Sequence, residues 1–202
     1  MRRRPIVGTV CVLLVIALLA GVNLAEAKEG FYLGGELLYN SIDGDFDGTK
    51  GPDSDNGGGI GLILGYGLTP GFSLEIDWNA SVHTAEVVRG ATPSDAGLGA
   101  FILALKYNFL SHQPLQPFLR AGIGGYAFIV KDPRGDLKLT GSGFDLGGGV
   151  DYYVAPHFSI GAGVSRRFIE YRKIDFLGRK ANLSPKISGD TTSLEVDFIY
   201  HF

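Results

Sequence analysis

The chain ends in a strictly alternating stretch, Leu194-Glu195-Val196-Asp197-Phe198-Ile199-Tyr200-His201-Phe202. Successive side chains of a β-strand point to opposite faces, so every second residue shares a face. The face that runs from Leu194 to Phe202 is apolar and aromatic, while the other carries Glu195, Asp197 and His201. A strand with one apolar and one acidic face suits a sheet between lipid and a polar interior. The pattern is typical of a transmembrane β-barrel.

The start of the chain has the layout of a secretory signal peptide. Arg2 to Arg4 precede an apolar run from Ile6 to Ala20, and Ala25-Glu26-Ala27 matches the small-residue pattern of a cleavage site. The apolar run is shorter than the roughly 20 residues that a membrane-spanning helix needs. We therefore expect cleavage after Ala27, a signal peptide over 1–27 and one mature domain over 28–202.

The composition excludes several classes of function. The chain has 18 basic and 21 acidic residues, a net charge of −3 at pH 7, which gives no support to nucleic acid as a partner. Its one cysteine, Cys11, lies in the expected signal peptide, so the mature domain needs no disulfide and offers no thiolate ligand. No later apolar run is long enough for a spanning helix. A membrane protein of this sequence must therefore cross the bilayer with strands.

Eight alternating stretches can be traced along the mature chain. They cover residues 30–42, 57–68, 72–84, 96–109, 117–130, 143–154, 157–171 and 190–202. Short connections such as Thr69-Pro70-Gly71 and Ala155-Pro156 have turn chemistry. They alternate with longer polar loops over 43–56, 85–95, 131–142 and 172–189. Because short turns at one rim and long loops at the other are typical of outer-membrane barrels, we predict an all-β fold, an eight-stranded antiparallel up-and-down transmembrane β-barrel.

The face opposite the apolar side chains carries ten charged residues. They are Glu36, Glu75, Asp77, Lys106, Arg120, Asp145, Asp151, Arg167, Glu195 and Asp197. The interior of an eight-stranded barrel is only wide enough to be filled by its own side chains. Because an unpaired buried charge costs several kcal/mol, we expect a lumen charge network, with Lys106, Arg120 and Arg167 threaded among the carboxylates.

The stretch from Gly143 to Pro156, Gly-Phe-Asp-Leu-Gly-Gly-Gly-Val-Asp-Tyr-Tyr-Val-Ala-Pro, resembles the OmpA/OmpX-type family of small outer-membrane barrels. The glycine-rich strand, the aromatic pair and the short turn carry the resemblance, which extends over 28–202. It implies export through the periplasm to the outer membrane of a Gram-negative cell. It also implies that the barrel-assembly machinery recognises Phe202 as the assembly signal. The family has no common catalytic motif, so we expect no catalytic residue, no cofactor and a monomer.

The first long loop opens with Asp43-Gly44-Asp45-Phe46-Asp47-Gly48, which matches the first half of a calcium-binding loop. The twelfth position of the pattern is Ser54, where a bidentate glutamate is expected. No helical pattern flanks the loop. We interpret the segment as a solvated acidic loop and keep metal binding by Asp43, Asp45 and Asp47 as the alternative.

The last predicted loop is basic. Its cations are Arg172, Lys173, Arg179, Lys180 and Lys186, with Arg166 close by. Exposed cationic clusters attract anions over a long range, and lipopolysaccharide phosphates lie at this height of the membrane. Outer-membrane lipid and lipopolysaccharide are therefore the expected partners, with a merely solvated loop as the alternative.

His157 and Ser159 lie on one strand face just after a turn and are similar to the catalytic His-x-Ser pair of outer-membrane lipid A deacylases. Ile160 stands where that family has an asparagine, and the pair lies at the short-turn rim rather than near the outer leaflet. The leading hypothesis is a non-enzymatic outer-membrane protein with a structural or surface-interaction role, such as adhesion. A lipid A-modifying hydrolase using His157 and Ser159, and a small-solute channel, are the alternatives.

Overall fold

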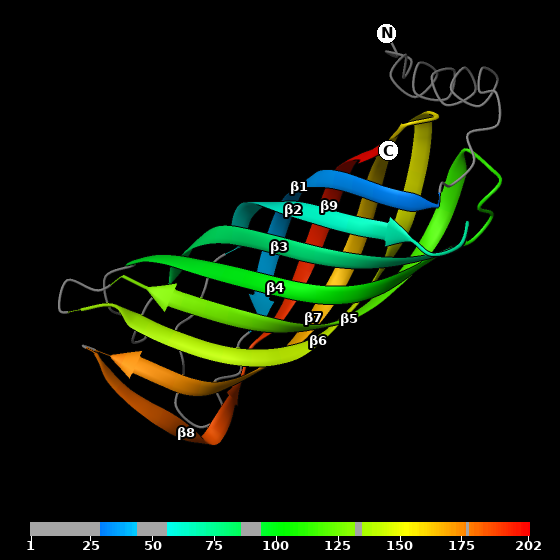
Figure 1. Ribbon diagram of the computed structural model, residues 1–202. Helices are drawn as coiled ribbons and strands as arrows, with labels where there is room; N and C mark the ends of the chain where they lie inside the picture. Colours follow the sequence, from blue (N-terminus) through cyan, green and yellow to red (C-terminus); the bar gives the residue numbers. More distant parts are fainter. Residues whose placement is uncertain (1–28, 44–55, 86–93, 132–134, 177) are drawn as a thin grey trace, which may run out of the picture.

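The computed structural model describes residues 29–43, 56–85, 94–131, 135–176 and 178–202 (Figure 1). The expected signal peptide and its cleavage after Ala27 lie outside these residues. The described strands are β1 (Gly30–Asp43), β2 (Gly57–Gly67), β3 (Phe72–Ala85), β4 (Ser94–Asn108), β5 (Leu115–Val130), β6 (Leu137–Ala155), β7 (Phe158–Phe176), β8 (Arg179–Ser188) and β9 (Asp190–His201). Within the same ranges, no helix is long and apolar enough to cross a membrane.

Eight of the strands close into a ring. Neighbours in sequence pair from β1 to β7, β7 pairs with β9, and β9 returns to β1, with every pairing antiparallel. The prediction of an eight-stranded antiparallel β-barrel is confirmed. Strand β8 stands outside the ring and pairs with β7, at the end of the barrel away from the carboxyl terminus (Figure 1).

The strands are strongly staggered around the ring. A row of paired residues that starts at Gly35 runs through β2, β3 and β4 to Gly125 on β5. Followed the other way, through β9, β7 and β6, the same row reaches β5 at Leu115. One circuit therefore shifts the register by ten residues. A stagger of this kind requires strands that tilt against the barrel axis, so each row climbs as it goes round the wall.

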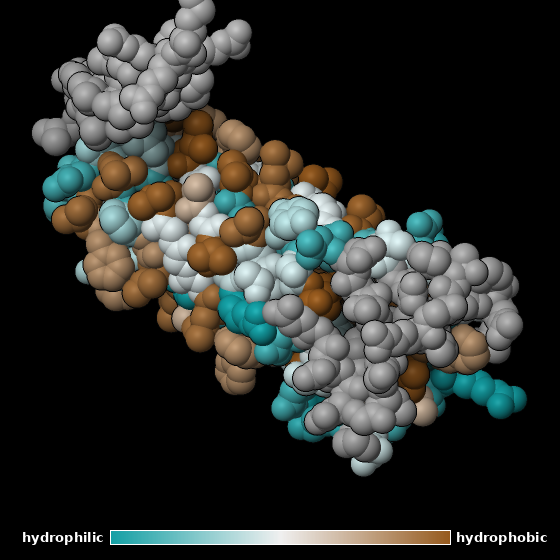
Figure 2. Space-filling view, turned by 180° about the vertical axis from the view of Figure 1, so that it is seen from behind, coloured by the Kyte–Doolittle hydropathy of each residue, from teal (hydrophilic) through white to brown (hydrophobic). Residues whose placement is uncertain are grey.

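The exterior of the ring is apolar. Leu62, Trp78, Phe101, Leu119 and Phe144 are all exposed, Trp78 and Phe144 to 65% each. Figure 2 shows hydrophobic residues spread over the barrel wall and hydrophilic residues gathered mostly towards its ends. Large exposed apolar surfaces on a closed sheet are stable only against lipid.

The loops predicted over 131–142 and 172–189 are partly wrong. Strand β6 already begins at Leu137, β7 continues to Phe176, and β8 occupies most of the second loop. A register irregularity between Tyr171 and Lys173 marks the point where the sheet extends beyond the ring. There the outward face no longer contacts lipid and carries polar residues such as Lys138 and Lys173, so the alternation that reveals a membrane strand fades.

Candidate functional site

The ten charged residues predicted for the lumen are all buried inside the ring, each at most 7% exposed. They come from β1, β3, β4, β5, β6, β7 and β9. Seven are carboxylates and three are cations. The lumen is therefore both crowded and acidic, and its geometry decides what the barrel can do.

Arg120 ties together strands on both sides of the lumen. Its Nη2 donates to Asp77 Oδ2 of β3 at 2.8 Å, and its Nε donates to Asp145 Oδ1 of β6 at 3.3 Å. Its Nη1 also lies 4.0 Å from Glu75 Oε2. Hydrogen bonds between ionised groups are stronger than those between neutral groups. The side chain of Arg120 therefore blocks the middle of the lumen, held there by its hydrogen bonds to β3 and β6.

Arg167 extends this network towards β9. Its Nε lies 3.4 Å from Asp145 Oδ2, and its Nη2 donates to Glu195 Oε1 at 3.4 Å. Its Nη1 donates to Asn79 Oδ1 at 3.3 Å. Asp145 is thus shared by Arg120 and Arg167, which makes their two sets of contacts one continuous network. Asn79 is a member of this network that charge patterning alone could not reveal.

Lys106 occupies the side of the lumen nearer the short turns. Its Nζ lies 2.9 Å from Asp151 Oδ2 and 3.7 Å from Glu75 Oε1. The same ammonium lies 4.1 Å from the centre of the Phe118 ring, a cation–π geometry. Glu75, which contacts both Lys106 and Arg120, connects the two halves of the network.

Two carboxylates stand outside these ion pairs. Glu36 and Asp197 make no ion pair with any described residue, and both Glu36 carboxylate oxygens are buried without a hydrogen-bond partner in the same part of the chain. The expectation that all ten charges would pair is therefore not met. Three cations cannot serve seven carboxylates, and both guanidinium groups are already occupied by Asp77, Asp145 and Glu195.

The lumen end next to the short turns is closed by aromatic side chains. The imidazole of His201 lies between Tyr32 and Tyr153, with ring centres 5.3 and 5.0 Å away. Ser159 Oγ lies 3.0 Å from His201 Nε2, whereas His157 Nδ1 lies 2.8 Å from the His201 carbonyl oxygen. The His157 and Ser159 side chains of the hydrolase alternative are therefore not brought together. The histidine that contacts the serine comes from β9.

The space beside Ser159 does not fit an acyl substrate. The cavity there measures about 20 Å³ and is lined by Tyr32, Lys106, Asp151 and His201, which is about the room that a single water needs. Ser159 itself is buried. The geometry supports a structural hydrogen bond rather than a catalytic centre.

The other half of the lumen holds a large apolar cluster on β4, β5, β6 and β7, made of Ala96, Leu98, Ala100, Ile102, Ala104, Tyr126, Phe128, Val130, Leu139, Ile169 and Tyr171. Buried polar side chains face it from β1 and β3, where Asn40 donates to Ser81 at 2.8 Å and Ser81 lies 2.8 Å from His83. Glycines at 122 and 124 leave room for the apolar cluster, since a side chain on either would meet Ile102 within about 3.0 Å. From the short-turn end outwards, the lumen thus contains first the aromatic rings around His201, then the charge network, and then the apolar cluster.

The predicted metal loop lies almost entirely outside the residues that the structure describes. Residues 44–55, with Asp45 and Asp47, lie outside the described residues, and Asp43 ends β1 opposite Asp190. Among the residues that the structure does describe, no group of three or more His, Cys, Asp or Glu is placed to hold a metal ion.

The basic segment predicted from sequence forms a three-stranded extension of β6, β7 and β8. Lys138, Asp175 and Lys180 are paired in one row across the three strands. Lys173 lies two residues from Asp175 along β7, on the same face of the sheet. These residues line a depression of about 380 Å³. Nearer the ring, Glu170 accepts hydrogen bonds from Lys186 at 2.8 Å and Arg172 at 3.2 Å, and Arg166 donates to Asp190 at 3.4 Å.

The closed ring, its apolar wall and its filled lumen define a transmembrane β-barrel of the outer-membrane type. The chain belongs to the family of the outer membrane protein beta-barrel domain, whose model matches residues 10–202. The protein is therefore located in the outer membrane of Gram-negative bacteria. No sequence among the curated proteins matches this chain.

Solved structures with the same fold include three small outer-membrane proteins. Neisserial surface protein A, from Neisseria, has a TM-score of 0.62 at 17% identity, covering 86% of this chain and 98% of that one. OprG from Pseudomonas aeruginosa has a TM-score of 0.62 at 18% identity, covering 89% and 100%. The attachment invasion locus protein Ail of Yersinia pestis, in complex with the heparin analogue sucrose octasulfate, has a TM-score of 0.56 at 12% identity, covering 87% and 100%.

Proposed function

We propose that this protein is a non-enzymatic outer-membrane barrel that binds anionic polymers at the cell surface through the extension of β6, β7 and β8. The observation that carries the proposal is the cluster of Lys138, Lys173 and Lys180 on one face of this extension. In barrels of this kind, short turns face the periplasm and longer segments face outwards. The extension lies at the end opposite the short turns and is therefore assigned to the outside.

The charge balance of the lysine cluster favours an anionic partner. Three ammonium groups surround a depression that contains one carboxylate, Asp175, in a chain whose overall net charge is −3. All three lysines are exposed, and none makes an ion pair with a described residue. Such a local excess of positive charge attracts polyanions against the sign of the whole molecule.

The filled lumen supports a surface role over a channel. Arg120 and Arg167 cross the middle of the ring, and its outer half holds the apolar cluster around Tyr126 and Ile169 beside the hydrogen-bonded Asn40 and Ser81. A hydrated path through these side chains would require several buried ion pairs to separate at once, at a cost of several kcal/mol each.

A polysulfated ligand is the natural probe for this chemistry. Ail, which shares the fold, was crystallised with a heparin analogue, whereas the proposal for the present chain rests on its own lysines. Sulfates, phosphates and carboxylates along a polymer can each pair with one ammonium. The affinity should therefore fall steeply as salt is added.

The test compares two charge reversals in the folded, detergent-solubilised protein. Lys138→Glu should weaken binding of heparin about tenfold, or ~1.4 kcal/mol, because it removes one cluster cation and adds a repulsive charge. Lys131→Glu changes the net charge equally but lies outside the depression, so it should change the affinity much less. Equal losses from the two variants would show a non-specific charge effect and reject the proposed site.

A further inference from the structure

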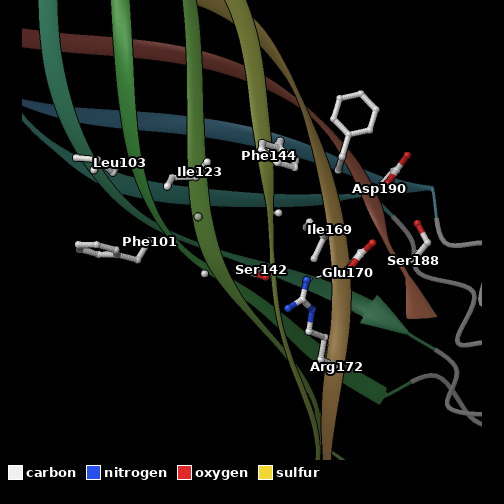
Figure 3. A pocket seen from close by; sticks show the side chains of 14 residues that line it. Phe101, Leu103, Ile123, Ser142, Phe144, Ile169, Glu170, Arg172, Ser188 and Asp190 are labelled. Atoms are coloured by element: carbon white, nitrogen blue, oxygen red, sulfur yellow. Dashed lines mark hydrogen bonds and ion pairs between the residues drawn. The ribbon is translucent and has the colours of Figure 1, made fainter. Parts of the chain in front are cut away.

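A depression lies on the outer wall of the barrel, within the lipid-facing surface of β4, β5, β6 and β7. It measures about 750 Å³, within the range of ligand sites in proteins. Figure 3 shows Phe101, Leu103 and Ile123 on one side of it, and Glu170, Arg172, Ser188 and Asp190 on the other, with Ser142 between. We call this depression the wall groove.

The floor of the wall groove is formed by residues with little or no side chain. Phe101, Gly125, Ser142 and Glu170 are paired consecutively across four strands, so they form one outward-facing row. The small members of that row, Gly125 and Ser142, leave the gap. A Cβ added at Gly125 would meet no atom within 4 Å, which shows that the space above it is open.

The wall on the membrane side of the groove is aromatic. In the row below, Ile123, Phe144 and Phe168 are paired in the same order and face outwards. Phe101 closes the groove at its end on β4. A slot between aromatic and aliphatic side chains on the lipid-facing wall is suited to an acyl chain.

The opposite rim of the groove is polar and carries charges of both signs. Arg172 and the adjacent Lys186 both pair with the carboxylate of Glu170, and Asp190, which also lines the groove, pairs with Arg166. Three cations therefore face two carboxylates. Arg172, Lys186 and Glu170 are about half exposed, and exposed pairs of this kind are worth little. A phosphate can therefore take over Arg172 and Lys186 without breaking a strong interaction.

We propose that the wall groove binds lipid A of the outer leaflet, with one acyl chain over Gly125 and Ser142 and a phosphate at Arg172 and Lys186. The apolar slot and the polar rim meet at the boundary between the hydrocarbon and the headgroups, where an acyl chain and a phosphate of the same molecule are adjacent. This inference is independent of the polymer-binding proposal, because it uses none of Lys138, Lys173 and Lys180.

The test fills the groove without disturbing the lumen. Gly125→Trp places an indole in the open space above the floor, and Gly58→Trp is the matched control, an outward glycine on β2 where an added Cβ also meets nothing within 4 Å. Native mass spectrometry of each folded variant, titrated in detergent with bis-phosphorylated lipid A, measures the bound fraction. Heat-modifiable gel mobility verifies that each barrel is folded.

We expect Gly125→Trp to lower lipid A binding about tenfold, while Gly58→Trp binds like the wild type. Arg172→Ala should lower binding of bis-phosphorylated lipid A but leave binding of dephosphorylated lipid A unchanged. Unaltered binding by Gly125→Trp would overturn the proposal, as would equal affinity of the wild type for the two forms of lipid A. Phosphatidylglycerol bound as tightly as lipid A would also overturn it. Heparin binding should remain intact in Gly125→Trp, which separates this test from that of the polymer site.

Discussion

Glu36 lies directly opposite Asp197 in the β1–β9 pair, so two carboxylates face each other inside the barrel. Like charges at directly opposed positions destabilise a sheet, and the cations of the lumen are occupied elsewhere. The barrel therefore encloses more carboxyl groups than cations. The ion pairs of Arg120, Arg167 and Lys106 hold the network together in spite of this local repulsion.

Neutralising Glu36 should stabilise the barrel. Glu36→Gln keeps the side-chain volume and removes one of the two opposed charges, so the free energy of unfolding should rise by about 1 kcal/mol. Urea titration of the protein folded in vesicles measures this change. Glu75→Gln is the control: Glu75 contacts Lys106, Arg120 and the Tyr32 hydroxyl, and its neutralisation should destabilise. A loss of stability in both variants would contradict the assignment of Glu36 as an unpaired carboxylate.

Removing Arg120 should be costly. Arg120→Ala leaves Asp77 and Asp145 without their shared guanidinium, and breaking a buried pair costs roughly 3–5 kcal/mol. Arg166→Ala removes a guanidinium from the same barrel, but from a partly exposed pair with Asp190, and should cost less than ~1 kcal/mol. Thermal melts in detergent compare the two. Matching melting temperatures would mean that the lumen network does not stabilise the barrel.

Deleting Phe202 should impair assembly in cells more than folding in vitro. The Phe202 ring is exposed and contacts Tyr200 edge-on at 5.2 Å between ring centres, so little packing is lost. The resemblance to small outer-membrane barrels predicts that Phe202 is the signal for the assembly machinery. Phe72→Ala, an exposed aromatic near the same rim, is the control for lost lipid contact. Equal amounts of assembled protein for the deletion and the wild type would reject this role.

Ser159→Ala should leave lipid A chemistry unchanged. The serine hydroxyl is buried against His201 beside a cavity of about 20 Å³, so its loss removes a hydrogen bond worth about 1 kcal/mol. Mass spectrometry of lipid A from cells that produce the wild type or the variant compares the acyl chains. A change of acylation with the wild type that disappears in Ser159→Ala would establish the hydrolase alternative.

The membrane part of the fold could be predicted because lipid contact on one face of each strand makes apolar and polar residues alternate along it. The alternation from Leu194 to Phe202 is a direct consequence, and the same rule assigned the ten lumen charges to the inner face. Strand β8 escaped prediction because neither face of Arg179–Ser188 contacts lipid, so its residues show no such pattern.

The pairings inside the lumen could not be predicted from local sequence. Arg167 reaches Asn79, which is 88 positions away, and Ser159 reaches His201, 42 positions away. The first contact crosses the lumen of the closed ring from β7 to β3, and the second depends on the pairing of β7 with β9. No single strand encodes either arrangement. The sequence indicates His157 as the partner of Ser159 because His157 is the histidine nearest to Ser159 along the chain. The pairing of β7 with β9 brings His201 to Ser159 instead.

Planar-bilayer recording of the purified, folded protein tests the closed lumen most directly. With Arg120 and Arg167 bonded across the ring and the apolar cluster above them, the wild type should show no stable unit conductance. Reproducible conductance steps of uniform size from the wild-type barrel would contradict the account.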